Sequence, residues 1–295
     1  MNISQTILKK RTLAQLLILF LGFQCISQST EQKNERTSRE EGNDVYKLIL
    51  LAGQSNMVGG GKKAQITIPK ISDNIIYYNY GKRMNLEIVS DDRFGPEIGI
   101  MEELTKHFPN EKFIILKYAV GGASMYGWSP DRDEEKVKVM GHPHFGKMSD
   151  SLFKYTALAI KDKKVSPTAF VWMQGETDAK YELAGKEYAY NFKKLIEAVR
   201  KEYNEKELPI IFGKVNPIAS RYPGLLAVQS SQRSIAKDIA NAYLVETDGL
   251  EKRSDSLHYS SKGLLGLGHR FGKIIVKVIN ENGQSLDLDD AKYKE

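Results

Sequence analysis

The sequence predicts an α/β fold in which helices cover both faces of an open parallel sheet, a three-layer α/β/α arrangement. Two observations predict it. Short apolar runs alternate along the chain with longer segments whose apolar residues recur every three or four positions. Polar or glycine residues directly follow several of the apolar runs, and the carboxyl ends of parallel strands are where ligand sites form.

Five apolar runs are expected to form the strands of this sheet. Each is short and largely apolar on both faces, as a strand covered by helices on both sides must be. The runs span residues 47–52, 113–120, 169–173, 209–212 and 242–246.

Three segments between and after these runs are expected to be amphipathic helices. Met148, Leu152 and Tyr155 are separated by steps of four and three, which places them on one stripe of a helix. The same spacing recurs over residues 188–203 and 264–278. Right-handed crossovers through such helices return the chain to a parallel strand, as the proposed sheet requires.

The N-terminal segment, residues 1–27, has the pattern of a secretory signal peptide. Three basic residues at positions 9–11 precede an apolar run over residues 13–23, which is too short to span a bilayer comfortably. Small residues at positions 25 and 27 predict cleavage after Ser27. Lipid anchoring at Cys25 is the alternative, but bulky residues precede that cysteine. We therefore expect an exported protein whose mature chain has no membrane span.

Composition and charge limit what the remaining chain can be. The 295 residues include 41% hydrophobic and 27% charged residues, a balance typical of a globular protein. Residues 28–44 contain no apolar side chain and are expected to form a flexible leader. One domain is expected over residues 45–283, with a polar tail over residues 284–295. Removing residues 1–27 lowers the formal charge from +6 by three, and so small a charge argues against nucleic-acid binding.

Polar strings follow four of the predicted strands. Because the carboxyl ends of parallel strands meet at one edge of a sheet, we expect these strings to lie together. They are Gly53-Gln54-Ser55-Asn56-Met57, Gly121-Gly122-Ala123-Ser124, Gln174-Gly175-Glu176-Thr177-Asp178 and a loop that ends in Asp255-Ser256-Leu257-His258.

Together the strings contain the parts of a serine esterase. The Ser55 hydroxyl becomes a nucleophile only when a base takes its proton, and the imidazole of His258 suits that task. Asp255, three residues earlier, can hold the ring and stabilise its charged form. The oxyanion of the transition state needs donors, for which the backbone N–H of Ser55, a glycine N–H of residues 121–122 and the Gln174 amide are candidates.

In this order the four strings resemble the sequence blocks of the SGNH hydrolases. They are most similar to the branch that holds sialate O-acetylesterases and the acetylxylan esterases of carbohydrate esterase family six. The resemblance covers roughly residues 46–280 and implies a flavodoxin-like sheet, no cofactor and removal of O-acetyl groups from sugars. It implies Ser55 as nucleophile, His258 as base, and Gly122 and Gln174 as oxyanion donors. Other members of the superfamily carry Asn in the third block. This chain has Gln174 at that position, and the branch shares this difference.

The carboxylate that orients the imidazole is left open between two residues. Asp255 is the first choice, because a separation of three residues is enough to bring its carboxylate to the His258 ring. In the family-six branch the third-block glutamate, here Glu176, has also been given this role, and we treat it as a helper. Two acids near one histidine share protons, so replacing either alone could leave partial activity.

No cofactor or metal is expected. Residues 59–64 loosely match a dinucleotide fingerprint, but the sequence that follows is not helical. His142 and His144 lack a third ligand nearby, so a surface loop is the better interpretation.

Three residues are candidates for contacts with the substrate. On the long segment after Ser124, Trp128 could stack on a sugar ring and Arg132 could face the carboxylate of glucuronic or sialic acid. A buried Trp128 that anchors this segment is the equal alternative. Asn56, next to the nucleophile, is the third candidate.

These observations predict an exported serine esterase that removes O-acetyl groups from acetylated xylan-type polysaccharide or sialic acid through an acyl-serine. A broad-specificity esterase or an acyltransferase with the same residues is the nearest alternative. A carbohydrate-binding protein without turnover is a third, and the presence of Ser55, His258 and both acids disfavours it. The sequence does not distinguish among the possible sugars.

Overall fold

The computed structural model describes residues 44–84 and 93–292, with side chains described as far as residue 281. The expected signal peptide with Cys25, and the leader up to residue 43, lie outside the described residues. No helix in the described part of the chain is both long enough and apolar enough to cross a membrane.

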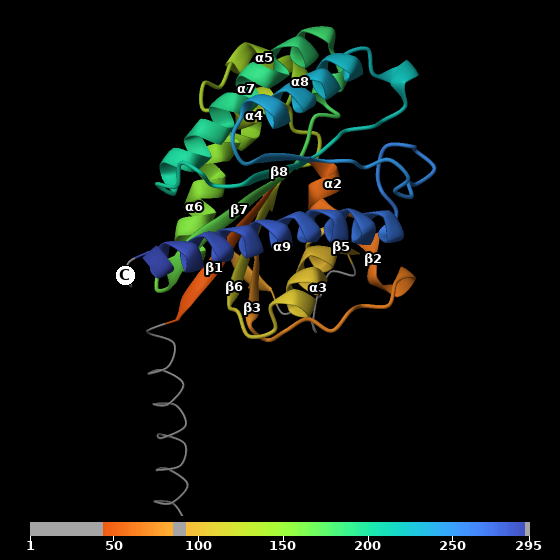
Figure 1. Cartoon of the computed structure of the whole chain (residues 1–295). Coiled ribbons are helices and arrows are strands. Elements are labelled where there is room, and N and C mark those ends of the chain that lie inside the picture. Colours follow the sequence, from red (N-terminus) through yellow and green to blue (C-terminus); the bar gives the residue numbers. More distant parts are fainter. Residues whose placement is uncertain (1–43, 85–92, 293–295) are drawn as a thin grey trace, which may run out of the picture. The chain divides into compact units, whose positions relative to one another are not determined.

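A seven-stranded sheet forms the middle layer, in the strand order β4-β3-β6-β1-β7-β8-β9 (Figure 1). All neighbouring strands are parallel except β4, which pairs antiparallel with β3 at one edge. The strands are β1 (Val45–Gly53), β3 (Ile75–Asn79), β4 (Lys82–Met84), β6 (Phe113–Ala119), β7 (Lys164–Met173), β8 (Ile210–Gly213) and β9 (Ala242–Val245). The five predicted strands are all present, and β3 and β4 extend the sheet beyond them.

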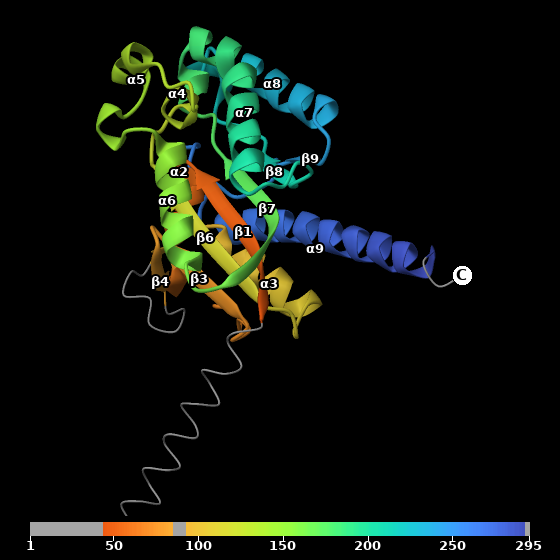
Figure 2. The ribbon, with the colours of Figure 1, turned by 90° about the vertical axis from the view of Figure 1, so that its left-hand side faces the viewer.

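Helices cover both faces of this sheet, which confirms the predicted three-layer fold. α3 and α9 pack against each other on one face, and α6, α7 and α8 lie on the other (Figures 1 and 2). The helices are α2 (Ser55–Val58), α3 (Glu97–His107), α4 (Met125–Trp128), α5 (Glu134–Met140), α6 (Met148–Ile160), α7 (Glu182–Glu202), α8 (Leu225–Asp238) and α9 (Ser261–Lys292).

The three predicted helical stripes lie in α6, α7 and α9. Met148, Leu152, Tyr188 and Phe192 are buried in the core, as an apolar stripe facing the sheet requires. α9 continues past residue 283, into the segment expected to be a polar tail.

The central position of β1 follows from its composition. Leu48, Ile49, Leu50 and Leu51 are at most 1% exposed, so both faces of the strand are covered. Such a strand is stable only between two layers of helices, and its carboxyl end therefore lies in the middle of the sheet edge. The chain turns into α2 at this end, which carries Ser55 to the same edge.

A separate two-stranded antiparallel pair lies beside the main sheet. It consists of β2 (Gly61–Lys62) and β5 (Arg93–Phe94), with Lys62 directly opposite Arg93. This pair was not predicted, because strands of two residues have no periodicity.

Gly53 allows the close contact between β1 and β7 on which the position of Ser55 depends. Its φ of +145° is a conformation that side chains rarely adopt, and a Cβ there would lie 2.1 Å from the Met173 carbonyl oxygen. We expect Gly53→Ala to lower the free energy of unfolding by about 3 kcal/mol or more. Urea unfolding measures this, with Gly121→Ala as control, because a Cβ on Gly121 meets nothing within 4 Å. Equal losses in the two variants would contradict this account of Gly53.

Candidate active site

Ser55 is the first residue of the short helix α2, directly beyond the end of β1. Gln54 anchors this turn to the end of β7 and the loop that follows it. Its backbone N–H donates to the Met173 carbonyl, and its side-chain oxygen accepts from the N–H groups of Gly175 and Thr177. The Ser55 side chain is partly exposed while Asn56 and Met57 are buried. The hydroxyl is thus held at the surface by a turn that is itself anchored in the core.

His258 lies across from Ser55 although 203 residues separate them. Its Nε2 is 3.0 Å from the Ser55 Oγ, and its Nδ1 is 2.7 Å from Asp255 Oδ2. With the proton on Nδ1, the ring donates to the carboxylate and Nε2 is free to accept the serine proton. This is the arrangement a serine nucleophile needs for activation.

A tight loop fixes Asp255 relative to the ring. Asp255 Oδ1 accepts from the backbone N–H groups of Leu257 and His258, each at 2.9 Å. Burial alone would raise the pKa of Asp255, but the hydrogen bonds from the His258 ring and from these backbone groups lower it to about 2. The carboxylate is therefore ionised over the whole range in which an imidazole acts as a base.

Glu176 reaches the histidine loop only through Asn56. The Asn56 Nδ2 donates to Glu176 Oε1 at 2.7 Å and to the Leu257 carbonyl, and its Oδ1 accepts from the N–H of Tyr259. Burial raises the pKa of Glu176, against the lowering effects of the Asn56 hydrogen bond and of nearby His258. Asp255 thus bonds the ring directly, and Glu176 positions the loop that carries it.

Asn56 is accordingly a positioning residue; it also lines the cavity of Ser55 and His258, and its predicted contact with substrate stays a prediction. The side chain is 2% exposed, and its amide bonds on one side to Glu176 and on the other to the chain around His258. Both hydrogens of the Asn56 amide are used within the protein, so its main role here is to hold the chain around His258.

Three of the candidate backbone N–H groups remain as donors for an oxyanion. Those of Ser55, Gly121 and Gly122 have no acceptor among the described residues. Gly122 has a φ of +71°, and the preceding Gly121 lines the same cavity as Ser55 and His258. Both glycines follow β6, the strand next to β1, so their backbone lies at the same sheet edge as the nucleophile.

The predicted role of Gln174 as an oxyanion donor stays a prediction, and the contacts of its side chain disfavour it. Its side chain is fully buried, and its Nε2 donates to the Ala123 carbonyl at 3.0 Å and to Asp178 Oδ2. Both amide hydrogens are therefore used within the protein. Gln174 instead ties the segment after β7 to the segment after β6.

Asp178, the partner of Gln174, is a buried acid whose protonation affects stability. Burial raises its pKa to about 7, against the hydrogen bonds from Gln174 and the Met125 N–H. Since the folded pKa lies above the ordinary value of 3.8, the folded protein binds this proton more tightly than the unfolded chain does. The stability contributed by the proton is present below pH 4 and lost as the pH rises toward 7.

We expect Asp178→Asn to remove this pH dependence. Relative to wild type, the Tm of the variant should rise between pH 4 and pH 8, because only the wild type has to bury a charge there, at a cost on the order of 4 kcal/mol. The unpartnered Oε1 of Gln174 can turn to accept from the new amide. Thermal unfolding across this range measures the difference, and a difference that is constant with pH would contradict the account.

Trp128 and the side chain of Arg132 are buried and make contacts within the protein, which disfavours the predicted contacts with a sugar ring and with its carboxylate. Trp128 is 0% exposed and packs edge-to-face against Tyr118 and Trp172, which confirms the alternative of a buried anchor. The Arg132 side chain is 2% exposed and donates to Glu134 and to the carbonyls of Pro143 and Gly146. It joins the two ends of its own loop instead of facing a carboxylate.

A buried ion pair that the sequence analysis did not identify supports the other side of the site. Lys117 Nζ lies 2.8 Å from Glu97 Oε2 and also donates to the Val58 carbonyl at the end of α2. Both side chains are 4% exposed. A lone lysine within an otherwise apolar strand is the signal, because a buried lysine needs a charged partner.

Ser55 and His258 open into a cavity of about 170 Å³, lined also by Gly121, Arg93 and Arg253. The two arginines were not singled out from the sequence. Within residues 44–84 and 93–281, no three side chains of His, Cys, Asp or Glu are grouped so as to hold a metal ion. The Ser55–His258–Asp255 hydrogen bonds form the arrangement that activates a serine hydroxyl.

Comparison with known proteins identifies the class. Residues 45–277 match the family described as "Carbohydrate esterase, sialic acid-specific acetylesterase". The chain belongs to this family and is a carbohydrate O-acetylesterase, which confirms the predicted resemblance and the enzyme class. A comparison with curated proteins found no significant match in sequence.

Solved structures with similar folds have low sequence identity to this chain. A protein from Arabidopsis thaliana has a TM-score of 0.64 at 19% identity, covering 79% of this chain and 98% of its own. The protein NanS has a TM-score of 0.60 at 16% identity, covering 81% and 98%. A carbohydrate acetylesterase from Xanthomonas citri has a TM-score of 0.57 at 16% identity, covering 77% of this chain and 55% of that one. At these identities the likeness establishes the fold.

Proposed function

We propose that this protein is an exported serine esterase that removes O-acetyl groups from an acetylated polysaccharide or from sialic acid through an acyl-serine intermediate. The observation that carries the proposal is the 3.0 Å hydrogen bond between Ser55 Oγ and His258 Nε2, with Asp255 bonded to the other ring nitrogen. Membership of the acetylesterase family supports an acetylated carbohydrate as substrate.

In the first half of the reaction, His258 Nε2 takes the Ser55 proton as Oγ attacks the acetyl carbonyl carbon. The resulting oxyanion accepts hydrogen bonds from the backbone N–H groups of Ser55 and Gly122. Asp255 stabilises the charged imidazole, which is the transition-state role its low pKa fits. His258 then donates the proton to the sugar oxygen, the C–O bond breaks, and the sugar leaves with a free hydroxyl.

In the second half, water takes the place of the sugar hydroxyl. His258 removes a proton from the water as its oxygen attacks the acetyl-serine, and returns the proton to Ser55 Oγ as acetate leaves. The overall balance is one ester and one water giving one alcohol and one acetic acid.

Export rests on the signal-peptide pattern of residues 1–27. If it is correct, the protein isolated from outside the cytoplasm of its host begins at Gln28, which N-terminal sequencing determines. A lipid-anchored protein would instead begin at Cys25.

The experiment that tests the substrate class compares acetate release from acetylated xylan, acetylated pectin, 9-O-acetylated sialic acid and an aryl acetate. We expect release from at least one of the carbohydrates. Turnover of the aryl ester alone would contradict the proposal and favour the broad-specificity esterase. If acetyl groups moved to an added sugar instead of water, the acyltransferase alternative would replace it.

A further inference from the structure

Three rings lie together at the surface, beside the loop that follows β6 (residues 121–124, the β6 loop). They belong to His142, His144 and Phe145, on the segment that leads from α5 to α6. The ring centroids of His144 and Phe145 are 4.6 Å apart, and that of His142 lies 5.6 Å from the first and 5.8 Å from the second. His144 is exposed, Phe145 is 40% exposed and His142 is half-buried. We call these three residues the aromatic group.

Two close contacts place the aromatic group against the β6 loop. A Cβ on Gly122 would lie 2.9 Å from His142 Nε2, so the imidazole covers one side of a glycine whose N–H is a candidate oxyanion donor. A Cβ on Gly141 would lie 2.9 Å from Ser124 Oγ, so the residue before His142 packs on the end of the same loop. The first glycine of the loop lines the cavity of about 170 Å³ that holds the nucleophile. An ester whose carbonyl lies at the β6 loop is therefore next to the aromatic group.

A buried arginine fixes the turn that carries the exposed rings. The Arg132 guanidinium donates to the carbonyls of Pro143 and Gly146, one before and one after the pair His144 and Phe145. The Arg132 side chain is 2% exposed, and its planar fork of donors holds both carbonyls at once. The exposed rings are thus held in place before a ligand arrives, which lowers the entropic cost of binding.

Exposed rings of this kind match the face of a sugar. A pyranose ring has C–H groups on its faces and hydroxyls around its edge, so it can pack on an aromatic ring while the hydroxyls stay in water. The imidazole nitrogens of His142 and His144 can also exchange hydrogen bonds with those hydroxyls. Aromatic side chains grouped at the surface next to a catalytic cavity therefore indicate a subsite for the substrate.

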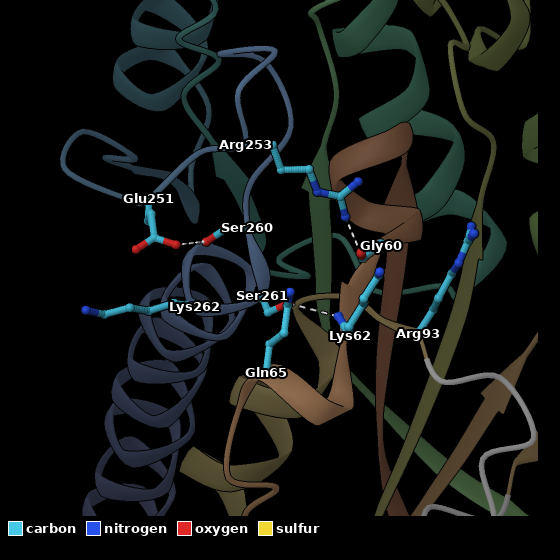
Figure 3. Close-up of a pocket in the computed structure, with 9 residues that line it drawn as sticks. All are labelled: Gly60, Lys62, Gln65, Arg93, Glu251, Arg253, Ser260, Ser261 and Lys262. Carbon is cyan, nitrogen blue, oxygen red and sulfur yellow. Dashed lines mark hydrogen bonds between the residues drawn. The ribbon is translucent and has the colours of Figure 1, made fainter.

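The larger cavity beside the nucleophile offers no such face. Its volume is about 610 Å³, and it shares Gly60, Arg93 and Arg253 with the cavity of Ser55 (Figure 3). Of the residues that line it in the described part of the chain, none is aromatic. In Figure 2, by contrast, α5 and the segment toward α6 lie beyond the end of β1 at which α2 begins. The apolar face of a sugar therefore finds its partner beside the β6 loop.

We propose that His142, His144 and Phe145 form a stacking subsite for a sugar ring of the acetylated glycan. The subsite receives the C–H face of the ring, whatever the charge of the sugar, and holds the glycan while its ester lies at Ser55. The inference rests on the proposed function, which places the ester there, and it adds residues that distinguish a glycan ester from a small acyclic one. The stacking contact thus falls on the same long segment as Trp128 but on its exposed part.

Binding is tested by NMR on the whole protein with ¹³C-labelled histidine, since the chain has five histidines. The probes carry no acetyl ester: xylotetraose, tetragalacturonate and N-acetylneuraminic acid. We expect at least one probe to shift the ring signals of His142 and His144, which their Gln variants assign. The C–H protons of that probe should move upfield, as protons above an aromatic ring do. If every probe left both histidine signals unchanged, the proposal would be overturned.

Variants of Phe145 distinguish stacking from ordinary apolar contact. Phe145→Leu keeps an apolar side chain but loses the flat ring, so it should weaken binding of the probe about fivefold, whereas Phe145→Trp should keep it. Tyr190→Leu is the matched control, because it removes a ring that is 60% exposed on α7 and lines neither cavity. Equal affinities of Phe145→Leu and Phe145→Trp, or equal losses in Phe145→Leu and Tyr190→Leu, would overturn the stacking.

Kinetics separate the subsite from the proposed function. Acetate release is compared between ethyl acetate and the carbohydrate that wild type hydrolyses fastest among those named above. The ratio of kcat/KM on the carbohydrate to kcat/KM on ethyl acetate should fall about fivefold in Phe145→Leu, through a higher KM for the carbohydrate. An unchanged ratio in an active enzyme would leave the esterase and overturn the subsite. Probe binding that depends on Phe145, without acetate release from any ester, would overturn the function and leave the subsite.

Discussion

Replacement of Ser55 by alanine is expected to lower kcat for acetate release by a factor of about 10⁴ or more. The variant loses the nucleophile, so only uncatalysed attack by water within the oxyanion site remains. Initial rates on an aryl acetate and on the preferred glycan measure the loss. The fold should be unaffected, because the Ser55 hydroxyl bonds to His258 Nε2 and not to a core residue.

The matched control for this variant is Ser234→Ala. Ser234 is exposed on α8 and donates only to Asp238, so removal of its hydroxyl should leave kcat and Tm unchanged. A Ser55→Ala enzyme that kept its rate while folding normally would require another nucleophile.

Asp255→Asn is expected to reduce kcat by about 10³ to 10⁴-fold. The amide can fit the same space, but it carries no charge for the imidazolium and can hold the ring in the wrong tautomer. The measurement is kcat on the aryl acetate, with the histidine ring protons observed by NMR as an independent readout of the tautomer. Because hydrogen bonds lower the pKa of Asp255 to about 2, wild type should not lose rate through this group above pH 4.

Glu176→Gln distinguishes the two carboxylates that the sequence left as alternatives. Glu176 does not bond the ring: it bonds Asn56, which holds the backbone on either side of His258. Because glutamine can still accept the Asn56 hydrogen bond, we expect a loss of at most about tenfold. A loss in Glu176→Gln as large as in Asp255→Asn would mean that Glu176, not Asp255, orients the imidazole.

The layers of the fold were predictable because buried parallel strands and amphipathic helices have distinct periods. The runs over residues 47–52 and 113–120 are apolar on both faces, which indicates central strands of a sheet covered on both sides. β3 was missed although Ile75–Asn79 is equally apolar, because it follows a long stretch without helical period. The pair β2 and β5 was beyond prediction, since two residues carry no periodicity.

The site was predictable where local spacing determines geometry. Asp255 and His258 lie three residues apart on one loop, and Ser55 directly follows a central strand, so the structure brings them within hydrogen-bond distance. Their catalytic roles stay predictions until activity is measured.

Other parts of the site depend on tertiary contacts that spacing does not encode. Whether Trp128 stacks on a sugar or fills the core depends on Tyr118 and Trp172, from two different strands. The Gln174 amide donates to Asp178, four residues later, instead of remaining free for an oxyanion. A string of polar residues does not predict this contact. Residue type alone therefore places both residues near the site but does not predict the contacts that their side chains make.

The most direct test of the catalytic account is to trap the acyl-enzyme. Wild type is mixed with an aryl acetate, quenched in acid within the first turnover, digested and analysed by mass spectrometry. We predict a single acetyl group on the peptide that contains Ser55, absent from the His258→Ala variant treated in the same way. Rapid acetate release with Ser55 unmodified, or with the acetyl group on another side chain, would contradict it.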